Sequence, residues 1–257
     1  MMTLTAVPTM YKRSLREAKR VLISTTFVPL VLPVFMLTIF ARVFAAVVRV
    51  PGFASTTAYS GYILPAVILM AVMLGSPTAG ISSAVELQTG FYDRMSMSPL
   101  GIGPSLVARR LADGTRVAGF VVVLLVAARI DGVVIHDWPL ALVVSVLLGA
   151  WWGVAYGGIA LSVCLKTASA EPAQALIPLF FPILFMSTGF MPLTLLPGWL
   201  QAIARYNPVS YLGDVIRGSL SGHIGAQSLW KAMLGVVLVS IFTQTLVFLA
   251  KRSRATA

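Results

Sequence analysis

Charged residues are scarce in this sequence. Only 11% of the 257 residues are Asp, Glu, Lys or Arg, and 58% are apolar. A soluble domain of this size carries about a quarter charged residues. The composition therefore predicts a protein whose surface meets lipid more than water. The single cysteine, Cys164, excludes a disulfide within the chain.

Motifs for ATP hydrolysis and other familiar chemistry are also missing. The sequence has no Gly-Lys dipeptide, which excludes a P-loop, and it has neither a G-x-S-x-G nor an H-E-x-x-H motif. Its two histidines, His136 and His223, fall in predicted connections on one side of the membrane and form no metal-binding pattern. We therefore expect no catalytic residue, no cofactor and no metal site in this chain.

Long uncharged runs predict six membrane-spanning helices, because a bilayer core of ~30 Å needs about 20 helical residues. The expected spans are 21–41, 60–83, 107–129, 138–165, 172–190 and 232–250. The third span includes Asp113 and Arg116, which are three residues apart and can pair on one helix face. The predicted fold class is an all-α polytopic membrane protein with one domain over residues 1–257.

Lysine and arginine predict the orientation of these spans. Thirteen of the 19 lie at the N-terminus, in the connection after span 2 and the start of span 3, after span 4 or at the C-terminus. Both termini are therefore expected in the cytoplasm. The net charge of +11 could suggest nucleic acid, but the basic residues lie beside apolar runs. We expect them to contact anionic lipid, and no nucleic acid.

Two segments outside the spans have the pattern of amphipathic helices. In residues 11–22, apolar side chains from Tyr11 to Leu22 share one face and basic residues occupy much of the rest, as in a helix lying on the membrane. Between spans 5 and 6, Asn207 and Pro208 predict a helix start, and Gly222 predicts its end. This outer helix could be re-entrant, interfacial or a plain surface helix.

Span 4 carries a ridge of small residues: Gly149, Gly153 and Gly157. Four-residue spacing places them on one helix face, where another helix can approach closely. The partner helix could belong to the same chain or to a second copy.

The connection from Glu86 to Arg110 is the longest on the cytoplasmic side. Residues 88–97 could form a short helix with Phe91 and Met95 on one face, ending near Pro99. Such a helix suits docking into a partner's groove, although an ordinary loop would show the same composition.

Two stretches together resemble the permease subunits of ABC-2 exporters, in particular the daunorubicin-resistance type. The first is Gly90-Phe-Tyr-Asp-Arg-Met-Ser-Met-Ser-Pro99, leading to Arg110-Leu-Ala-Asp113. The second runs from Pro197-Gly-Trp-Leu200 through Asn207-Pro-Val-Ser-Tyr211 to Asp214-Val-Ile-Arg-Gly218. The six spans and the amphipathic N-terminal segment agree, so the resemblance covers nearly the whole chain.

The resemblance implies a permease that works in a pair, with a second copy or a related permease, in the plasma membrane. Separate ATPase subunits would bind ATP and Mg²⁺, and a hydrophobic or amphipathic drug, antibiotic or lipid would leave the cell. Residues 86–99 would then be the segment that couples to the ATPase, and spans 1, 2 and 5 would line the pathway. Alternatives are an ATP-independent carrier or channel, or a scaffold; the absence of acidic residues in mid-span argues against ion coupling.

The site residues implied in this way form two groups. The coupling group is Glu86, Gly90, Phe91, Asp93, Arg94 and Met95, and the outer-helix or gate group is Asn207, Pro208, Tyr211, Asp214 and Arg217.

Overall fold

The computed structural model describes residues 2–20, 27–51, 53, 58–97 and 103–255, and these form helices and connections without a β-strand. Four helical segments within this part are long and apolar enough to cross a membrane, and two shorter apolar segments accompany them. The four are Tyr59–Gln88, Gly103–Ile130, Trp138–Thr167 and Ala226–Lys251; the shorter two are Val28–Val43 and Glu171–Phe185. The all-α membrane fold is confirmed, with the shorter segments at the positions of predicted spans 1 and 5.

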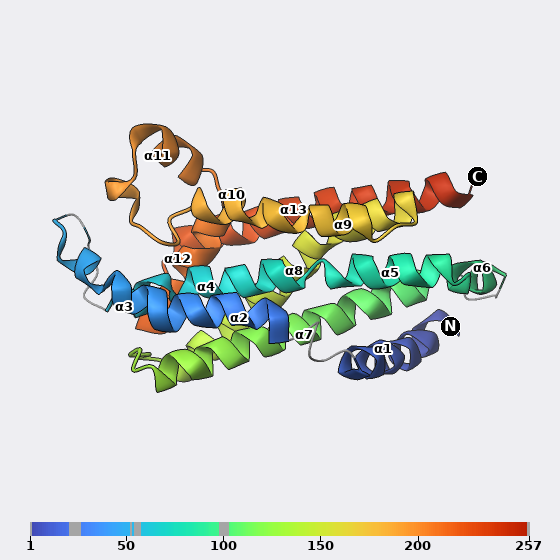
Figure 1. Ribbon diagram of the computed structural model, residues 1–257, viewed down its shortest axis with the longest axis horizontal. Coiled ribbons are helices and arrows are strands. Elements are labelled where there is room, and N and C mark those ends of the chain that lie inside the picture. The colour runs from blue at the N-terminus through green and yellow to red at the C-terminus, as the bar shows by residue number, and fades with distance from the viewer. Residues whose placement is uncertain (1, 21–26, 52, 54–57, 98–102, 256–257) are drawn as a thin grey trace.

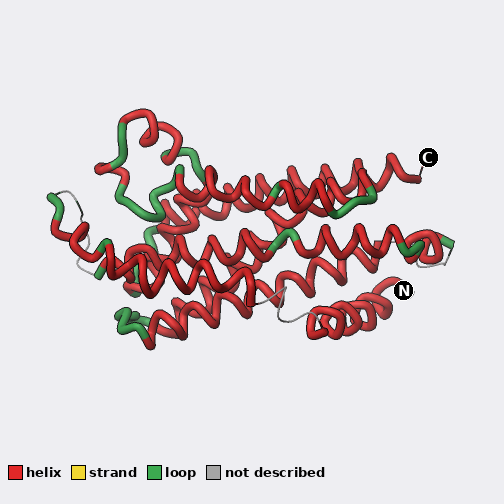
Figure 2. Tube along the Cα trace, viewed as in Figure 1, coloured by secondary structure: helices red, strands yellow, loops and turns green. Residues whose placement is uncertain are grey.

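The helices form an elongated bundle whose two ends differ (Figure 1). Both termini and the short helix α6 (Phe91–Ser96) lie at one end, which we call the terminal end. Helices α3 and α11 and the connection between α7 and α8 lie at the opposite end, which we call the far end. Figure 2 shows that loops are confined mainly to these two ends. Both chain ends thus lie together, as an even number of spans requires.

The N-terminal helix α1 spans Met2–Arg20, so the predicted start at residue 11 was wrong. Val7 continues the apolar stripe of Tyr11 and Leu15 toward the N-terminus, which agrees with the longer helix. The helix packs against α7 (Gly103–Ile130), where the hydroxyls of Tyr11 and Thr115 lie 2.8 Å apart. Its predicted last residues, 21 and 22, fall outside the described residues.

The first predicted span, 21–41, is described only from residue 27. Helix α2 (Val28–Phe35) continues through a π-helical segment (Met36–Phe40) into α3 (Ala41–Val43), and a 3-10 helix (Ala45–Arg49) follows. The helical path therefore extends a little beyond the predicted end.

The second span is a broken helix, and it reaches further than the predicted range 60–83. Helix α4 (Tyr59–Gly75) is almost wholly buried, and α5 (Thr78–Gln88) continues it after a turn at Ser76 and Pro77. Proline lacks an N–H, so the helical bonding pattern is interrupted there. The carbonyl of Gly75, beside the break, accepts a hydrogen bond from Arg116 Nη2 at 2.7 Å. Arg116 also pairs with Asp113 at 2.8 Å, as its spacing predicted.

The glycine ridge of helix α8 (Trp138–Thr167) packs inside the chain. A Cβ atom at Gly149 would lie 2.8 Å from the side chain of Val121, and one at Gly157 would lie 2.6 Å from the carbonyl oxygen of Ser76. A Cβ atom at Gly153 would lie 3.0 Å from the side chain of Val117 and 3.1 Å from that of Ser76. The ridge therefore lets α8 approach α7 and the α4–α5 break.

The fifth predicted span, 172–190, is not one continuous helix. It consists of α9 (Glu171–Ala175), a 3-10 turn (Ile177–Leu179) and α10 (Phe180–Phe185), after which the chain turns. Pro178 and Pro182 lie within it and supply no N–H for helical bonds, which explains the change in winding. Its helical part ends at Phe185, five residues before the predicted end of the span at residue 190.

Between α10 and the last helix lie α11 (Gly198–Ala204) and α12 (Pro208–Ser221). Helix α12 buries Leu212, Val215 and Ile216 completely against α4, α8 and α13 (Ala226–Ala255). Its apolar face therefore contacts protein, which distinguishes it from a helix that merely lies on a membrane surface. Helix α13 is longer than the predicted 232–250 at both ends.

Candidate functional site

Helix α6 at the terminal end is held as a separate turn after α5. Gly90, between the two helices, has a φ of +68°, a conformation that glycine adopts without steric cost, so it breaks the helix here. Tyr92 is only 1% exposed, and its hydroxyl donates to Ser83 Oγ at 3.3 Å. Burial raises the pKa of Tyr92 to about 12. Its buried ring and the hydrogen bond to Ser83 fix α6 against α5.

Glu86 lies within α5 and is buried, so the predicted start of the cytoplasmic connection at Glu86 was wrong. Its Oε1 atom is 2.6 Å from Arg109 Nη2 on α7 and 3.2 Å from Arg13 Nη2 on α1. The Glu86 and Arg109 side chains are 11% and 9% exposed, whereas Arg13 is 45% exposed. One carboxylate therefore joins three helices beside α6, and burial of two opposite charges requires this close pairing.

Phe91, one of the two side chains on the predicted docking face, is half-buried. Its ring packs on a second apolar cluster that includes Tyr92 and Leu106, and the guanidinium of Arg13 lies 4.1 Å above its centroid. Of two other members of the coupling group, Arg94 is exposed and Met95 is half-buried. Asp93 also lies in α6, but its side chain is outside the described part, as are residues 98 and 99.

Met97, just after α6, is an apolar side chain that is 81% exposed. Sequence reasoning passed over Met97, and it also missed Arg13, Arg109 and Tyr92. Tyr92 and Arg94 are two residues apart, so helical spacing could have placed them on opposite faces of the short helix, with Tyr92 facing the protein. The contacts of Arg13 and Arg109, however, join positions far apart in the sequence, and no local pattern predicts them.

The start and end of the outer helix α12 are as predicted. The side-chain oxygen of Asn207 accepts a hydrogen bond from the Val209 N–H at 2.9 Å, and Pro208 occupies the first turn. Gly222 ends the helix with a φ of +80°. Asn207 has a second role that the sequence did not predict, because its amide nitrogen donates to the carbonyls of Ile183 and Met186 at 2.6 and 3.0 Å. It thus ties α12 to the turn that follows α10.

The remaining members of the outer group form contacts on α12. Arg217 pairs with Asp214 at 2.7 Å, and its guanidinium lies 4.1 Å from the centroid of the Tyr62 ring on α4. A second nitrogen of Arg217 donates to the Thr188 carbonyl at 3.3 Å. The hydroxyl of Tyr211 donates to the carbonyl of Arg205. These contacts connect α12 with α4 and with the segment after α10.

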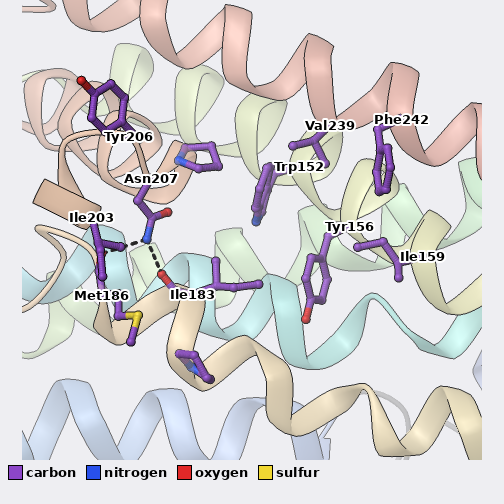
Figure 3. Close-up of a pocket in the computed structure, with 12 residues that line it drawn as sticks. Trp152, Tyr156, Ile159, Ile183, Met186, Ile203, Tyr206, Asn207, Val239 and Phe242 are labelled. Atoms are coloured by element: carbon purple, nitrogen blue, oxygen red, sulfur yellow. Dashed lines mark hydrogen bonds between the residues drawn. The ribbon is translucent and has the colours of Figure 1, made fainter. Parts of the chain in front are cut away.

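A pocket of about 550 Å³ lies beside these contacts, between α8, α10, α12 and α13 (Figure 3). Its wall is almost wholly apolar. The residues that line it are Trp152, Tyr156, Ile159, Pro182, Ile183, Met186, Ile203, Tyr206, Asn207, Pro208, Val239 and Phe242. Pockets of about 300–1,000 Å³ are typical of small-molecule sites. Among the residues that the structure describes, no three His, Cys, Asp or Glu side chains cluster as metal ligands.

Comparison with known proteins agrees with this architecture. The ABC-2 type transporter family matches residues 5–221. The daunorubicin resistance ABC transporter permease protein DrrB1 of Streptomyces coeruleorubidus is 28% identical over 79% of this chain and 70% of its own. The putative transport permease ycf38 of Porphyra purpurea is 26% identical over 84% of this chain and 73% of its own.

A further relative is the probable doxorubicin resistance ABC transporter permease protein DrrC of Mycobacterium tuberculosis. It is 26% identical over 62% of this chain, and the chain spans 58% of its length. The family match extends from α1 through α12, and so includes both groups of contacts described above. This chain therefore belongs to the ABC-2 type transporter family, whose members are membrane-embedded permease subunits of ABC transporters.

Proposed function

We propose that the chain is the membrane-spanning permease of an ATP-driven exporter in the plasma membrane, with its terminal end in the cytoplasm. Separate ATPase subunits bind ATP and Mg²⁺ and dock at that end, and a second permease completes the transporter. Family membership supports this division of labour. The Lys/Arg distribution supports the orientation, because thirteen of the 19 basic residues belong to that side.

The observation that carries the proposal is the way α6 is mounted. It is exposed at the tip of the bundle, yet Tyr92 fixes it to α5, and the Glu86 carboxylate beside it joins α5 to α7 and α1. A push on α6 is therefore passed to three helices instead of being absorbed by a loose loop. Such a rigid tip is what an ATPase needs in order to move a permease.

We infer that Met97 and Arg94 make the contact with the ATPase. Met97 is 81% exposed and flexible, so it can fill an apolar hole in a partner, and the exposed Arg94 supplies charge for register. Phe91 instead supports α6 from within. The cargo is a hydrophobic or amphipathic molecule, a drug, an antibiotic or a lipid, and the names of the DrrB1 and DrrC relatives favour a drug.

The test is to co-express the chain with an ABC ATPase subunit from the same genome, purify the complex in mild detergent, and reconstitute it in liposomes. We expect the ATPase to co-purify and daunorubicin, a fluorescent probe, to move only when ATP is added. Met97→Ala should weaken ATPase retention by about fivefold or more, because a central interface anchor contributes at least ~1 kcal/mol.

Ile130→Ala is the matched control, because Ile130 is 82% exposed but lies at the far end of α7. It should retain the ATPase fully. Daunorubicin movement by the permease alone, without ATP, would identify an ATP-independent carrier. A stable chain that neither binds an ATPase nor moves the probe would identify a scaffold.

A further inference from the structure

Arg110 on α7 is a cation that forms no ion pair within the part of the chain that the structure describes. Its Nη1 atom donates to Gln244 Oε1 on α13 at 2.6 Å, and its Nη2 atom donates to the Val154 carbonyl on α8 at 2.8 Å. Asp113, one turn further along α7, pairs with Arg116 at 2.8 Å. Arg110 thus joins three helices through neutral acceptors, which do not balance its positive charge.

Gly158 on α8 makes room for this guanidinium. A Cβ atom at Gly158 would lie 2.9 Å from Arg110 Nη2 and 2.9 Å from Thr243 Cβ on α13. The packing of the three helices therefore holds Arg110 in a half-buried place. A charge in such a place without a counter-charge is unfavourable, so an anion that reaches it from outside the chain is bound favourably.

A second cation lies about two helical turns away toward the terminal end. Lys251 on α13 is exposed, and its Nζ atom lies 3.8 Å from the position of a Cβ atom on Gly103 of α7. Gly103 and Arg110 are about two turns apart on one face of α7, and so are Gln244 and Lys251 on α13. The two contacts therefore define one seam, the α7–α13 seam, with cations about 10 Å apart along it.

The surface along this seam is apolar between the cations and beyond them. Val107 on α7 and Phe248 on α13 lie between the cations by helical spacing, and they are 51% and 55% exposed. Toward the far end, Trp151 on α8 lies one turn before the carbonyl that binds the guanidinium, and it donates to Ser240 Oγ on α13 at 3.0 Å. The neighbouring Ile241 is 59% exposed. An apolar strip therefore runs from the cations toward the far end.

The depth of the seam matches the boundary of a bilayer core. Residues 232–250 of α13 carry no charge, and they lie between Lys231, near the far end, and Lys251. About 20 residues of helix measure ~30 Å, which is the thickness of the hydrocarbon core. Lys251 therefore lies at the boundary beside the terminal end, and Arg110 lies within about 10 Å of it. Long basic side chains at this depth reach lipid headgroups.

We propose that the α7–α13 seam binds one anionic phospholipid from the leaflet beside the terminal end. Its phosphate meets Lys251 and Arg110, its glycerol backbone covers Val107 and Phe248, and an acyl chain continues over Ile241. A zwitterionic lipid offers the same chains, but the cation of its headgroup opposes the two cations of the protein. Only the designation of this leaflet as the inner one rests on the proposed function, and the binding itself does not.

The probes are phosphatidylglycerol and phosphatidylcholine with the same acyl chains. The full-length chain is delipidated in detergent, and each lipid is titrated while native mass spectrometry counts the bound molecules. We expect the first phosphatidylglycerol to bind about fivefold or more tightly than the first phosphatidylcholine, because each basic residue near an anionic lipid contributes about a fivefold preference. No ATPase or transport enters this assay, so its failure would leave the proposed function untouched.

Variants at the two cations and at one matched lysine give the decision. Lys251→Gln and Arg110→Gln should each lower the preference for phosphatidylglycerol about fivefold. Arg110→Lys keeps the charge and should keep the preference, which separates the charge from the hydrogen bonds that Arg110 makes. Lys231→Gln removes an exposed lysine at the far end of the same helix, and should bind both lipids like the wild type. If Arg110→Gln does not fold, Lys251→Gln decides alone, because its side chain is exposed.

Equal lipid preference in Lys251→Gln and Lys231→Gln would overturn the proposal, and would leave a general attraction between lipid and a basic chain. Loss of the preference in Arg110→Lys would also overturn it, since helix packing would then cause the effect. A second copy of the chain is tested separately with Phe248→Cys in a Cys164→Ser background. Disulfide-linked dimers of that variant in native membranes would show that another copy, and no lipid, covers the seam.

Discussion

Replacing Glu86 by glutamine tests whether the buried carboxylate at the terminal end is structural. The change removes the negative charge that contacts Arg109 and Arg13 but keeps the size of the side chain. Arg109 is 9% exposed, so it keeps its charge in a nearly dry position. A buried charge that loses its counter-charge costs about 3–5 kcal/mol. The glutamine oxygen can still accept one hydrogen bond, so we expect a loss of about 2–4 kcal/mol.

The matched comparison is Arg13→Gln, which removes the other cation from the same carboxylate. Arg13 is 45% exposed, so its ion pair contributes at most about 1 kcal/mol, and its contact with the Phe91 ring about the same. The two variants should therefore differ by a kcal/mol or more in unfolding free energy. The double variant Glu86→Gln/Arg109→Gln should recover part of the loss, because it removes the buried charge as well.

The assay is thermal unfolding of the purified permease in mild detergent. The fraction that remains folded after heating is measured as the height of the monomeric peak in size-exclusion chromatography. Limited proteolysis between α1 and α2 reports separately whether α1 detaches. If Glu86→Gln unfolds at the wild-type temperature and loses only the ATPase, then Glu86 is a docking residue. The reasoning from its burial would then be refuted.

Three further substitutions test the packing of other elements. Gly157→Ala places a Cβ atom 2.6 Å from the carbonyl of Ser76 and should destabilise by about 1–3 kcal/mol, whereas Gly119→Ala, with open space around its Cβ, should be neutral or stabilising in the same thermal assay. Asn207→Ala should cost about 2 kcal/mol, measured by denaturant or heat, since it removes a helix cap and two amide donors; Asn207→Asp keeps the cap and should lose less. Gly90→Ala should cost about 1 kcal/mol at its φ of +68°, and Gly90→Asn less, with proteolysis near α6 as the readout. The close packing at Gly157 would be contradicted if Gly157→Ala and Gly119→Ala were equally stable. The contacts of Asn207 would be contradicted if Asn207→Ala were as stable as the wild type. The requirement for glycine at position 90 would be contradicted if all Gly90 variants were equally stable.

The sequence determined the features that depend on composition and local spacing. Uncharged runs long enough to cross a bilayer predicted the all-α membrane fold, and the spacing of Asp113 and Arg116 predicted their pairing. Asn207 and Gly222 predicted the limits of α12, because capping is a contact between near neighbours in the chain. Each of these arises within a few helical turns, so the local sequence contains what is needed.

Other features were predicted only as alternatives, and the packed bundle decided between them. The glycine ridge could have faced a second copy, but it accommodates Val121, Val117 and Ser76 of the same chain. The apolar face of α12 could have lain in the membrane interface, but it packs on α4, α8 and α13. An amphipathic stripe shows that one face is buried and does not show against what.

The terminal end shows most clearly what only tertiary structure decides. The sequence placed Glu86 at the start of a cytoplasmic connection and Phe91 on the docking face of a short helix within it. The fold extends α5 through Glu86, and brings Arg13 and Arg109 from helices far apart in the sequence to one carboxylate. Arg13 also covers the Phe91 ring, whereas Met97 is 81% exposed. Which charge is buried and which is exposed depends on contacts between distant segments, and those contacts form only when the helices pack.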